Sequence, residues 1–295
     1  MGEQSPVTMP VLTPSRGRKS ILCSLGVMTF LVYILYSRHS SSQQALPPMS
    51  GTYQYFTEIN FEYHTHSFGA ISHCDPRFAP SRPPSIEETK KTLLALVKSF
   101  AATMNDLRAE TWIAHGTLLG WYWNQKVLPW DNDIDVQMTV ETLSRLAARN
   151  MSEYHYPAGG AGDDAPRVYL LDINPHYSTV STRDVANKID GRWIDTTNGK
   201  YIDITAVHVS VGKTEHAPFD QGVFFSKDGH RYLSEELFPL EDESFEGVAV
   251  KVPRKSSKIL SDEYGKKSLT NSHFHWGLML NRHRFNKTSK IWEPE

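Results

Sequence analysis

Two aspartates, two residues apart, are the side chains in this sequence best suited to chemistry. They lie in the run DNDIDV at residues 131–136, where acidic and apolar residues alternate from Asp133 onward. A period of two predicts a strand, with Asp133 and Asp135 on one face and apolar side chains on the other. Adjacent carboxylates repel each other unless a cation lies between them, and oxygen-only ligands favour a hard cation such as Mg²⁺ or Mn²⁺. The pair therefore predicts a metal site, with a solvated acidic turn as the alternative.

A glycine–threonine turn precedes the acidic pair. Gly116 and Thr117 follow an apolar dipeptide and precede LLG, a pattern that predicts a strand, a tight turn and a helix start. A helix N-terminus beside a small residue can bind phosphate through backbone N–H groups. Lys126 lies in the same loop and is a candidate phosphate contact, with a solvated lysine as the alternative. The turn and the acids together predict a metal-assisted phosphate site.

A family resemblance rests on these residues. The run HGTLLGWYWNQKVLPWDNDIDV resembles the LicD family, which includes the fukutin-type proteins and fungal proteins linked to mannosylphosphate transfer. That family is similar to the nucleotidyltransferase-fold superfamily, whose pattern is a glycine turn, an Asp-x-Asp pair on a strand and a third acid on a neighbouring strand. The resemblance spans residues 85–280 and matches each part of that pattern: Gly116, Thr117, Asp133, Asp135 and Asp203.

The resemblance implies an α/β (α+β) domain, with a nucleotidyltransferase-like mixed sheet and flanking helices. It also implies transfer of a phosphorylated sugar or alcohol, such as mannosylphosphate, from a nucleotide-diphosphate donor to a hydroxyl of a glycan or glycoprotein. Asp133, Asp135 and Asp203 would then be the metal ligands and catalytic residues. Two alternatives stay open. One is a non-catalytic partner or regulator of a Golgi transferase; the other is an ordinary DxD glycosyltransferase, which needs a larger parallel sheet.

The predicted helices around the site begin at recognisable caps. Ser85 and Glu88 form a capping box that predicts a helix reaching about Ala109. Thr139 begins a second predicted helix, which ends near Arg149. Their apolar positions recur at helical spacing, so we expect both helices to pack against the sheet that carries the acids.

The third acid lies on a predicted hairpin. Residues 192–195 and 201–207 alternate around Asn198-Gly199, a strong hairpin signal. Asp203 then falls in mid-strand, where aspartate is unfavourable, and Asp195 is a weaker alternative for the same role. Residues 167–173 predict a further strand, and 238–253 predict a β unit followed by a short helix.

Composition limits the function classes. The chain has 295 residues, a net charge of −2 and 39% hydrophobic residues, which is enough for one substantial domain with appendages. A nucleic-acid-binding protein would need a basic face, so nucleic acid is not an expected partner. Cys23 and Cys74, the two cysteines, exclude a cysteine-rich zinc site.

The N-terminal part predicts membrane attachment. Residues 21–36 are uncharged and apolar, slightly short of the roughly 17–25 residues of a spanning helix. We expect a cytosolic tail at 1–19, a transmembrane signal anchor at 20–37, a stem at 38–84 and the catalytic domain at 85–295. This predicts a single-pass type II protein of the Golgi or ER membrane with its domain in the lumen. A cleaved signal peptide is the alternative.

Several aromatic and histidine side chains have no assigned role. Four aromatic residues between the turn and the acids predict core packing, or alternatively stacking on a nucleotide base: Trp121, Tyr122, Trp123 and Trp130. The stem histidines predict a polar loop: His64, His66 and His73. Near the C-terminus, a polar tail is predicted to contain His273, His275 and Trp276.

Overall fold

The computed structural model describes residues 54–59, 73–160, 165–276 and 281–295. Its helices are α2 Ile86–Asp106, α3 His115–Asn124, α4 Val140–Ala147, α5 Ser234–Leu237 and α6 Ser256–Tyr264. The predicted tail and signal anchor, and much of the predicted stem, lie outside the described residues. Within the described ranges, no helix combines the length and the apolar character needed to cross a membrane.

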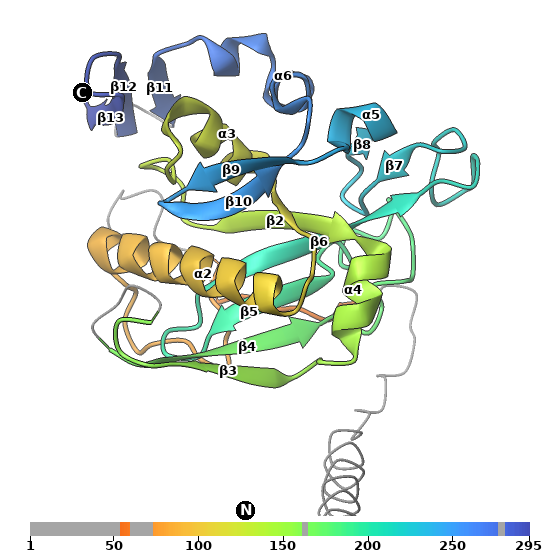
Figure 1. Cartoon of the computed structure of the whole chain (residues 1–295), viewed down its shortest axis with the longest axis horizontal. Coiled ribbons are helices and arrows are strands. Elements are labelled where there is room, and N and C mark those ends of the chain that lie inside the picture. The colour runs from red at the N-terminus through yellow and green to blue at the C-terminus, as the bar shows by residue number, and fades with distance from the viewer. Residues whose placement is uncertain (1–53, 60–72, 161–164, 277–280) are drawn as a thin grey trace, which may run out of the picture. The chain divides into compact units, whose positions relative to one another are not determined.

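An eight-stranded mixed sheet forms the centre of the described fold (Figure 1). Its main path runs β1-β2-β6-β5-β4-β3, and β7 pairs with both β6 and β8. β2 and β6 are parallel, and the other neighbouring pairs are antiparallel. The strands are β1 Trp112–Ile113, β2 Ile134–Thr139, β3 Ser152–Tyr156, β4 Arg167–Ile173, β5 Gly191–Asp195, β6 Tyr201–Val209, β7 Phe224–Phe225 and β8 Arg231–Tyr232. The α+β class with a mixed sheet is therefore confirmed.

Helix α2 covers one face of this sheet because its apolar side chains recur at helical spacing (Figure 1). Leu93 and Phe100 are buried in the main core. Ser85 Oγ accepts a hydrogen bond from the Glu88 N–H at 3.2 Å, and the Glu88 carboxylate accepts one from the Ser85 N–H at 2.7 Å. The predicted capping box is present, and the helix ends at Asp106, slightly before its predicted end.

The predicted hairpin joins β5 to β6. Gly199 in the connecting turn has a φ of 75°, the left-handed region that glycine adopts without a steric penalty. Its N–H donates to the Asp195 carbonyl at 2.8 Å. A Cβ on Gly199 would also lie 2.8 Å from the Asp75 carbonyl oxygen, so the turn is closely packed as well as tight.

Two smaller antiparallel sheets follow. β9 Glu241–Phe245 and β10 Val248–Val252 form the predicted β unit, and β11 His273–Trp276, β12 Asn281–Asn286 and β13 Ile291–Pro294 form a three-stranded sheet. The prediction of a polar tail at His273 and His275 is therefore wrong, since both residues pair with β12. The reason is an aromatic contact: Phe274 stacks on Trp130 with ring centroids 3.7 Å apart.

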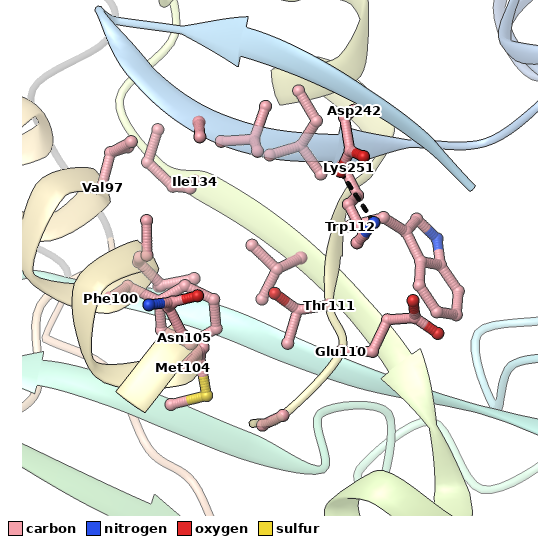
Figure 2. A pocket seen from close by; sticks show the side chains of 17 residues that line it. Val97, Phe100, Met104, Asn105, Glu110, Thr111, Trp112, Ile134, Asp242 and Lys251 are labelled. Carbon is pink, nitrogen blue, oxygen red and sulfur yellow. Dashed lines mark hydrogen bonds and ion pairs between the residues drawn. The ribbon is translucent and has the colours of Figure 1, made fainter. Parts of the chain in front are cut away.

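A pocket of about 190 Å³ is lined by residues of α2, β1, β2, β6 and β10, whose side chains Figure 2 shows. Ile134 on β2 and Ile202 on β6 contribute to its mainly apolar lining. Because successive strand side chains point to opposite faces, Asp135 and Asp203 project away from this cavity. The core side and the acidic side of the two strands are thus separated by the sheet itself.

Candidate functional site

Asp135 and Asp203 lie side by side on the parallel strands. Asp135 on β2 is the register partner of Asp203 on β6, as Ile134 is of Ile202 one residue earlier. Neighbouring strands are about 4.8 Å apart, so the two carboxylates leave the same face at close range. The two isoleucines belong to the buried core. The predicted alternation therefore brings Asp203 beside the acidic pair.

Asp195, the weaker alternative for the third acid, has other partners. Its side chain is fully buried, and Arg167 Nη1 contacts its Oδ2. The Thr197 N–H donates to Asp195 Oδ1 at 2.9 Å, and Asn198 Nδ2 donates to Oδ2 at 3.3 Å. Asp195 thus stabilises the hairpin turn, whereas Asp203 faces Asp135.

Asp131 and Asp133 bring further carboxylates to the start of β2. Burial and the Asp133 charge raise the pKa of Asp131 well above its ordinary value. Burial and the same charge also raise the pKa of Asp135. Such shifts mean that negative charge is unfavourable in this cluster without a compensating cation. The donors gathered here are carboxylate oxygens, the type of ligand that Mg²⁺ and Mn²⁺ prefer.

The glycine–threonine element lies in the first turn of α3, after the N-cap Ala114. Thr117 Oγ1 accepts a hydrogen bond from the Asp135 N–H at 2.9 Å, which fixes the helix start against β2. Gly116 faces Asp131, because a Cβ there would lie 2.9 Å from Asp131 Oδ2. The first N–H groups of a helix have no partner within it. The start of α3 therefore lies beside Asp131 and Asp135, and a phosphate contact at Gly116 and Thr117 stays a prediction.

His73, predicted only as part of a polar loop, contacts the acidic cluster. Its Nε2 is 3.2 Å from Asp133 Oδ2, and its Nδ1 is 3.7 Å from Asp203 Oδ2. Burial lowers the pKa of His73, but the neighbouring carboxylates of Asp203 and Asp133 outweigh burial and raise the pKa to about 9. A protonated imidazole thus compensates two of the predicted ligands. Sequence spacing could not reveal this contact because His73 is 60 or more residues from Asp133 and Asp203. The other two stem histidines, His64 and His66, lie outside the described residues.

Arg192 holds Asp203 from the neighbouring strand β5. Its Nε donates to Asp203 Oδ1 at 3.2 Å, and its Nη2 donates to Glu58 at 3.3 Å. The guanidinium carbon lies 3.7 Å from the ring centroid of Tyr201. Arg192 is only 2% exposed, so these contacts replace the water that would otherwise solvate its guanidinium. Glu58 belongs to the predicted stem, which therefore contributes directly to the surroundings of the site.

Lys126 and two of the tryptophans have partners other than the acids. Lys126 Nζ is 3.7 Å from Glu246 Oε2 and the side chain is 59% exposed, so its partner in the described part of the chain is an acid of the β9–β10 turn. Trp123 and Trp130 both contact Trp292 on β13, with ring centroids 4.9 Å apart in each case. These contacts agree with the packing interpretation of the aromatic residues.

Comparison with known proteins supports a family assignment. Residues 108–255 match the family model described as LicD/FKTN/FKRP, nucleotidyltransferase domain. The chain is 32% identical over 123 residues to Mannosyltransferase regulator 4 of Saccharomyces cerevisiae, covering 41% of this chain and 10% of the yeast protein. It is 32% identical over 126 residues to Mannosyltransferase regulator 14 of the same yeast, covering 42% of this chain and 13% of that protein.

The chain thus matches only about a tenth of the length of these two relatives. The family match, in contrast, covers half of the chain and contains the whole constellation of the glycine–threonine turn, the acidic pair and Asp203. Since the matched segment also includes the parallel strands that bring Asp135 and Asp203 together, this chain belongs to the LicD family.

Proposed function

We propose that this protein transfers a phosphorylated sugar or alcohol from a nucleotide-diphosphate donor to a hydroxyl of a glycan or glycoprotein. The observation that carries the proposal is the pairing of Asp135 with Asp203 on parallel strands, directly beside the glycine–threonine turn. Carboxylates that crowd together next to free helix N–H groups suit a diphosphate bound with a divalent cation. LicD membership supports the same class of reaction.

The proposed roles follow from the position of each residue. Asp133, Asp135 and Asp203 would hold Mg²⁺ or Mn²⁺, which when bound would neutralise the charge of the diphosphate. Gly116 and Thr117 would bring backbone N–H groups to a phosphate oxygen. Asp203 is also the candidate acceptor for the proton of the attacking hydroxyl, because a general base must lie within hydrogen-bond reach of it.

The contact of His73 with Asp133 and Asp203 bears on how the donor enters. A divalent cation bound at the aspartates would compete with the His73 imidazolium for the same carboxylate oxygens. We expect the His73 side chain to leave these oxygens when the cation and donor bind. It would then be available to contact the donor phosphates.

A second candidate function is regulation of a separate transferase. The two yeast relatives are named mannosyltransferase regulators, which favours this alternative. Retention of all three aspartates favours catalysis, since a regulator has no need of a cation site. Stabilisation by Mn²⁺ together with a nucleotide, lost in Asp135→Asn, would support the transferase; a parent that neither metal nor nucleotide stabilises would support the regulator.

The decisive experiment identifies the nucleotide that is released. Purified protein is incubated with a panel of nucleotide-sugars and nucleotide-alcohols, Mn²⁺ and a glycan acceptor. Nucleoside monophosphate is expected, because the phosphate next to the transferred group moves with it. Nucleoside diphosphate would mean plain glycosyl transfer, and no release with any donor would leave the regulatory function. Asp135→Asn is the negative control.

We also propose a luminal location for the domain, held by a signal anchor at residues 20–37. Asn150-Met151-Ser152 and Asn286-Lys287-Thr288 have the pattern of glycosylation acceptors. Endoglycosidase treatment of the native protein should therefore raise its gel mobility, and Asn150→Gln with Asn286→Gln should abolish that shift. The luminal location would be contradicted if the band did not shift and if added protease digested the domain in intact microsomes.

A further inference from the structure

Two histidines and a glutamate converge next to the aspartates. His115 is the first residue of α3, His230 lies in the turn between β7 and β8, and Glu263 lies in the last turn of α6 (Figure 1). One ligand atom from each lies within 4.8 Å of the others. His115 Nδ1 is 2.7 Å, and His230 Nε2 is 3.6 Å, from Glu263 Oε1. Three segments far apart in the sequence thus point nitrogen and oxygen donors at one place.

A second carboxylate faces the remaining ring nitrogens. Asp228 Oδ1 is 3.0 Å from His230 Nδ1, and Asp228 Oδ2 is 3.6 Å from His115 Nε2. Asp228 is itself held by the Ser226 hydroxyl and by the His230 N–H, which donates to Oδ1 at 3.2 Å. Metal-binding imidazoles commonly donate their other ring N–H to such a carboxylate, which fixes the tautomer and the orientation of the ring. Asp228 lies within ion-pair distance of both rings, where it would give this support to metal-bound imidazoles.

We propose that His115, His230 and Glu263 bind a transition-metal cation of the Zn²⁺ class, at a site separate from the three aspartates. Zinc takes His nitrogens and carboxylate oxygens at roughly 2.0–2.2 Å, so tetrahedral ligand atoms are about 3.4 Å apart. The two measured separations to Glu263 bracket this value. Two imidazoles favour Zn²⁺ over Mg²⁺ or Mn²⁺, which prefer oxygen ligands.

The site would fix the element that begins the proposed phosphate contact. His115 directly precedes Gly116 and Thr117, and its φ of 49° is in the left-handed region that non-glycine residues rarely adopt. A cation bound by His115 and Glu263 would connect the start of α3 to α6. It would also connect both helices to the β7–β8 turn through His230. The cation would therefore hold the first turn of α3 in place against α6 and the β7–β8 turn.

The competing arrangement is an ion pair without a cation. Gln137 Nε2 lies 3.4 Å from His115 Nε2, and Gln137 Oε1 accepts from Trp112 Nε1 at 3.2 Å. A Gln137 amide that donates to His115 Nε2 would leave the proton of His115 on Nδ1. That nitrogen would then donate to Glu263 and could not bind a metal. The two arrangements differ in metal binding, which makes the proposal directly testable.

The test measures metal binding by the full-length protein after chelator treatment and removal of the chelator. Co²⁺ is titrated in while its visible absorption is recorded, because this absorption is intense only for low-coordinate sites, and Zn²⁺ is then added in competition. The metal content after Zn²⁺ loading is measured by mass spectrometry. The variants are His230→Gln, Glu263→Gln, Asp228→Asn and Asp203→Asn. Matched controls are His216→Gln and Glu215→Gln, two exposed residues outside the cluster.

We expect one tightly bound Co²⁺ or Zn²⁺ per chain in the parent, in both controls and in Asp203→Asn. His230→Gln and Glu263→Gln should weaken this binding by at least a hundredfold, and Asp228→Asn by about tenfold to a hundredfold. The proposal would be overturned by a parent that binds neither Co²⁺ nor Zn²⁺ tightly. It would also be overturned if His230→Gln and Glu263→Gln bound the metal as tightly as the parent does, or if Asp203→Asn lost this binding. His230 is in a surface turn, so its variant remains informative if Glu263→Gln fails to fold. The proposal does not depend on transferase activity, which Asp203→Asn tests separately.

Discussion

Asp135→Asn should stabilise the metal-free protein, although it removes a residue of the site. Asp135 and Asp203 are register partners on strands about 4.8 Å apart. At an effective dielectric constant of about 20, two charges about 5 Å apart repel by roughly 3 kcal/mol. His73 and Arg192 compensate part of that repulsion. We therefore expect a gain of about 1–2 kcal/mol in the free energy of unfolding at pH 8.

The gain should depend on pH in a defined direction. Burial and the Asp133 charge raise the folded-state pKa of Asp135 above its unfolded value of about 3.9. The folded state then holds a proton that the unfolded state has lost, so stability falls as the pH rises from the unfolded to the folded pKa. The slope is at most about 1.4 kcal/mol per pH unit for one proton. The charged groups that act on Asp135 are Asp131, Asp133, Asp203, His73 and His115.

Asp203→Asn provides the contrast, because Asp203 has a cationic partner. Arg192 is buried and would lose the carboxylate that lies 3.2 Å from its Nε. An orphaned buried charge is costly, but Glu58 and Tyr201 remain in contact with Arg192. We therefore expect a loss of about 2 kcal/mol from the weakened pair. The two substitutions should thus change the stability of the metal-free protein in opposite directions, while both abolish stabilisation by Mn²⁺.

The assay is urea unfolding, followed by tryptophan fluorescence in the presence of chelator at pH 6, 7 and 8. Asp106→Asn, an exposed acid at the end of α2, is the control and should change stability little. The measurements are repeated with Mn²⁺ and no chelator. The reasoning is refuted if Asp135→Asn is less stable than the parent at pH 8, or if its gain does not grow between pH 6 and pH 8.

Three further substitutions test other parts of the structure. Gly116→Val should reduce the affinity for Mn²⁺ with nucleotide at least tenfold and the unfolding free energy by only about 1 kcal/mol, because its Cβ would displace Asp131. Calorimetry measures the affinity and urea unfolding the stability. Losses of equal free energy in binding and in stability would favour a purely structural turn. Ser85→Ala should cost about 1 kcal/mol in urea unfolding without changing Mn²⁺ affinity, because it removes only the cap of α2. Lys227→Met should lower the unfolding free energy by about 3–5 kcal/mol, because it leaves the fully buried Asp190 without the ammonium now 2.6 Å away. If the double variant Lys227→Met with Asp190→Asn recovers most of that stability, the unpaired carboxylate is the cause.

The regular elements around the site were predictable because their signals are local. The alternation around Asp135 and the turn at Gly199 each specify a strand or a hairpin within a few residues, and both are present. Ser85 likewise specifies the start of α2. The family pattern then added Asp203, whose neighbour across the sheet no local signal could identify.

Contacts between distant segments could not be predicted in this way. His73, His115 and His230 occupy loops or element ends, where no periodicity indicates which way a side chain points. The partners of His115 and His230 are set by the packing of α3, α6 and the β7–β8 turn, and those of His73 by the docking of its segment beside β2 and β6. The C-terminal sheet was missed for a different reason: HFHW at 273–276 alternates as a strand does, but its polar residues suggested a tail.

Two parts of the chain line the site, the strands β2 and β6 and the segment that carries His73, and their backbone hydrogen bonds should open at different rates. Asp203 and Asp135 stand on strands inside the sheet, so their backbone amides are expected to exchange with solvent only through large-scale opening. Within the described residues, the segment that carries His73 instead docks through a bridge between Cys74 and Lys200, the Asp75 N–H bond to the Gly199 carbonyl, the Ile59 N–H bond to the Cys74 carbonyl, and side-chain contacts. In hydrogen exchange, amides 73–78 should become labelled well before those of β6. Access to the acids would then require only the release of a docked segment, while the strands that hold the acids stay folded.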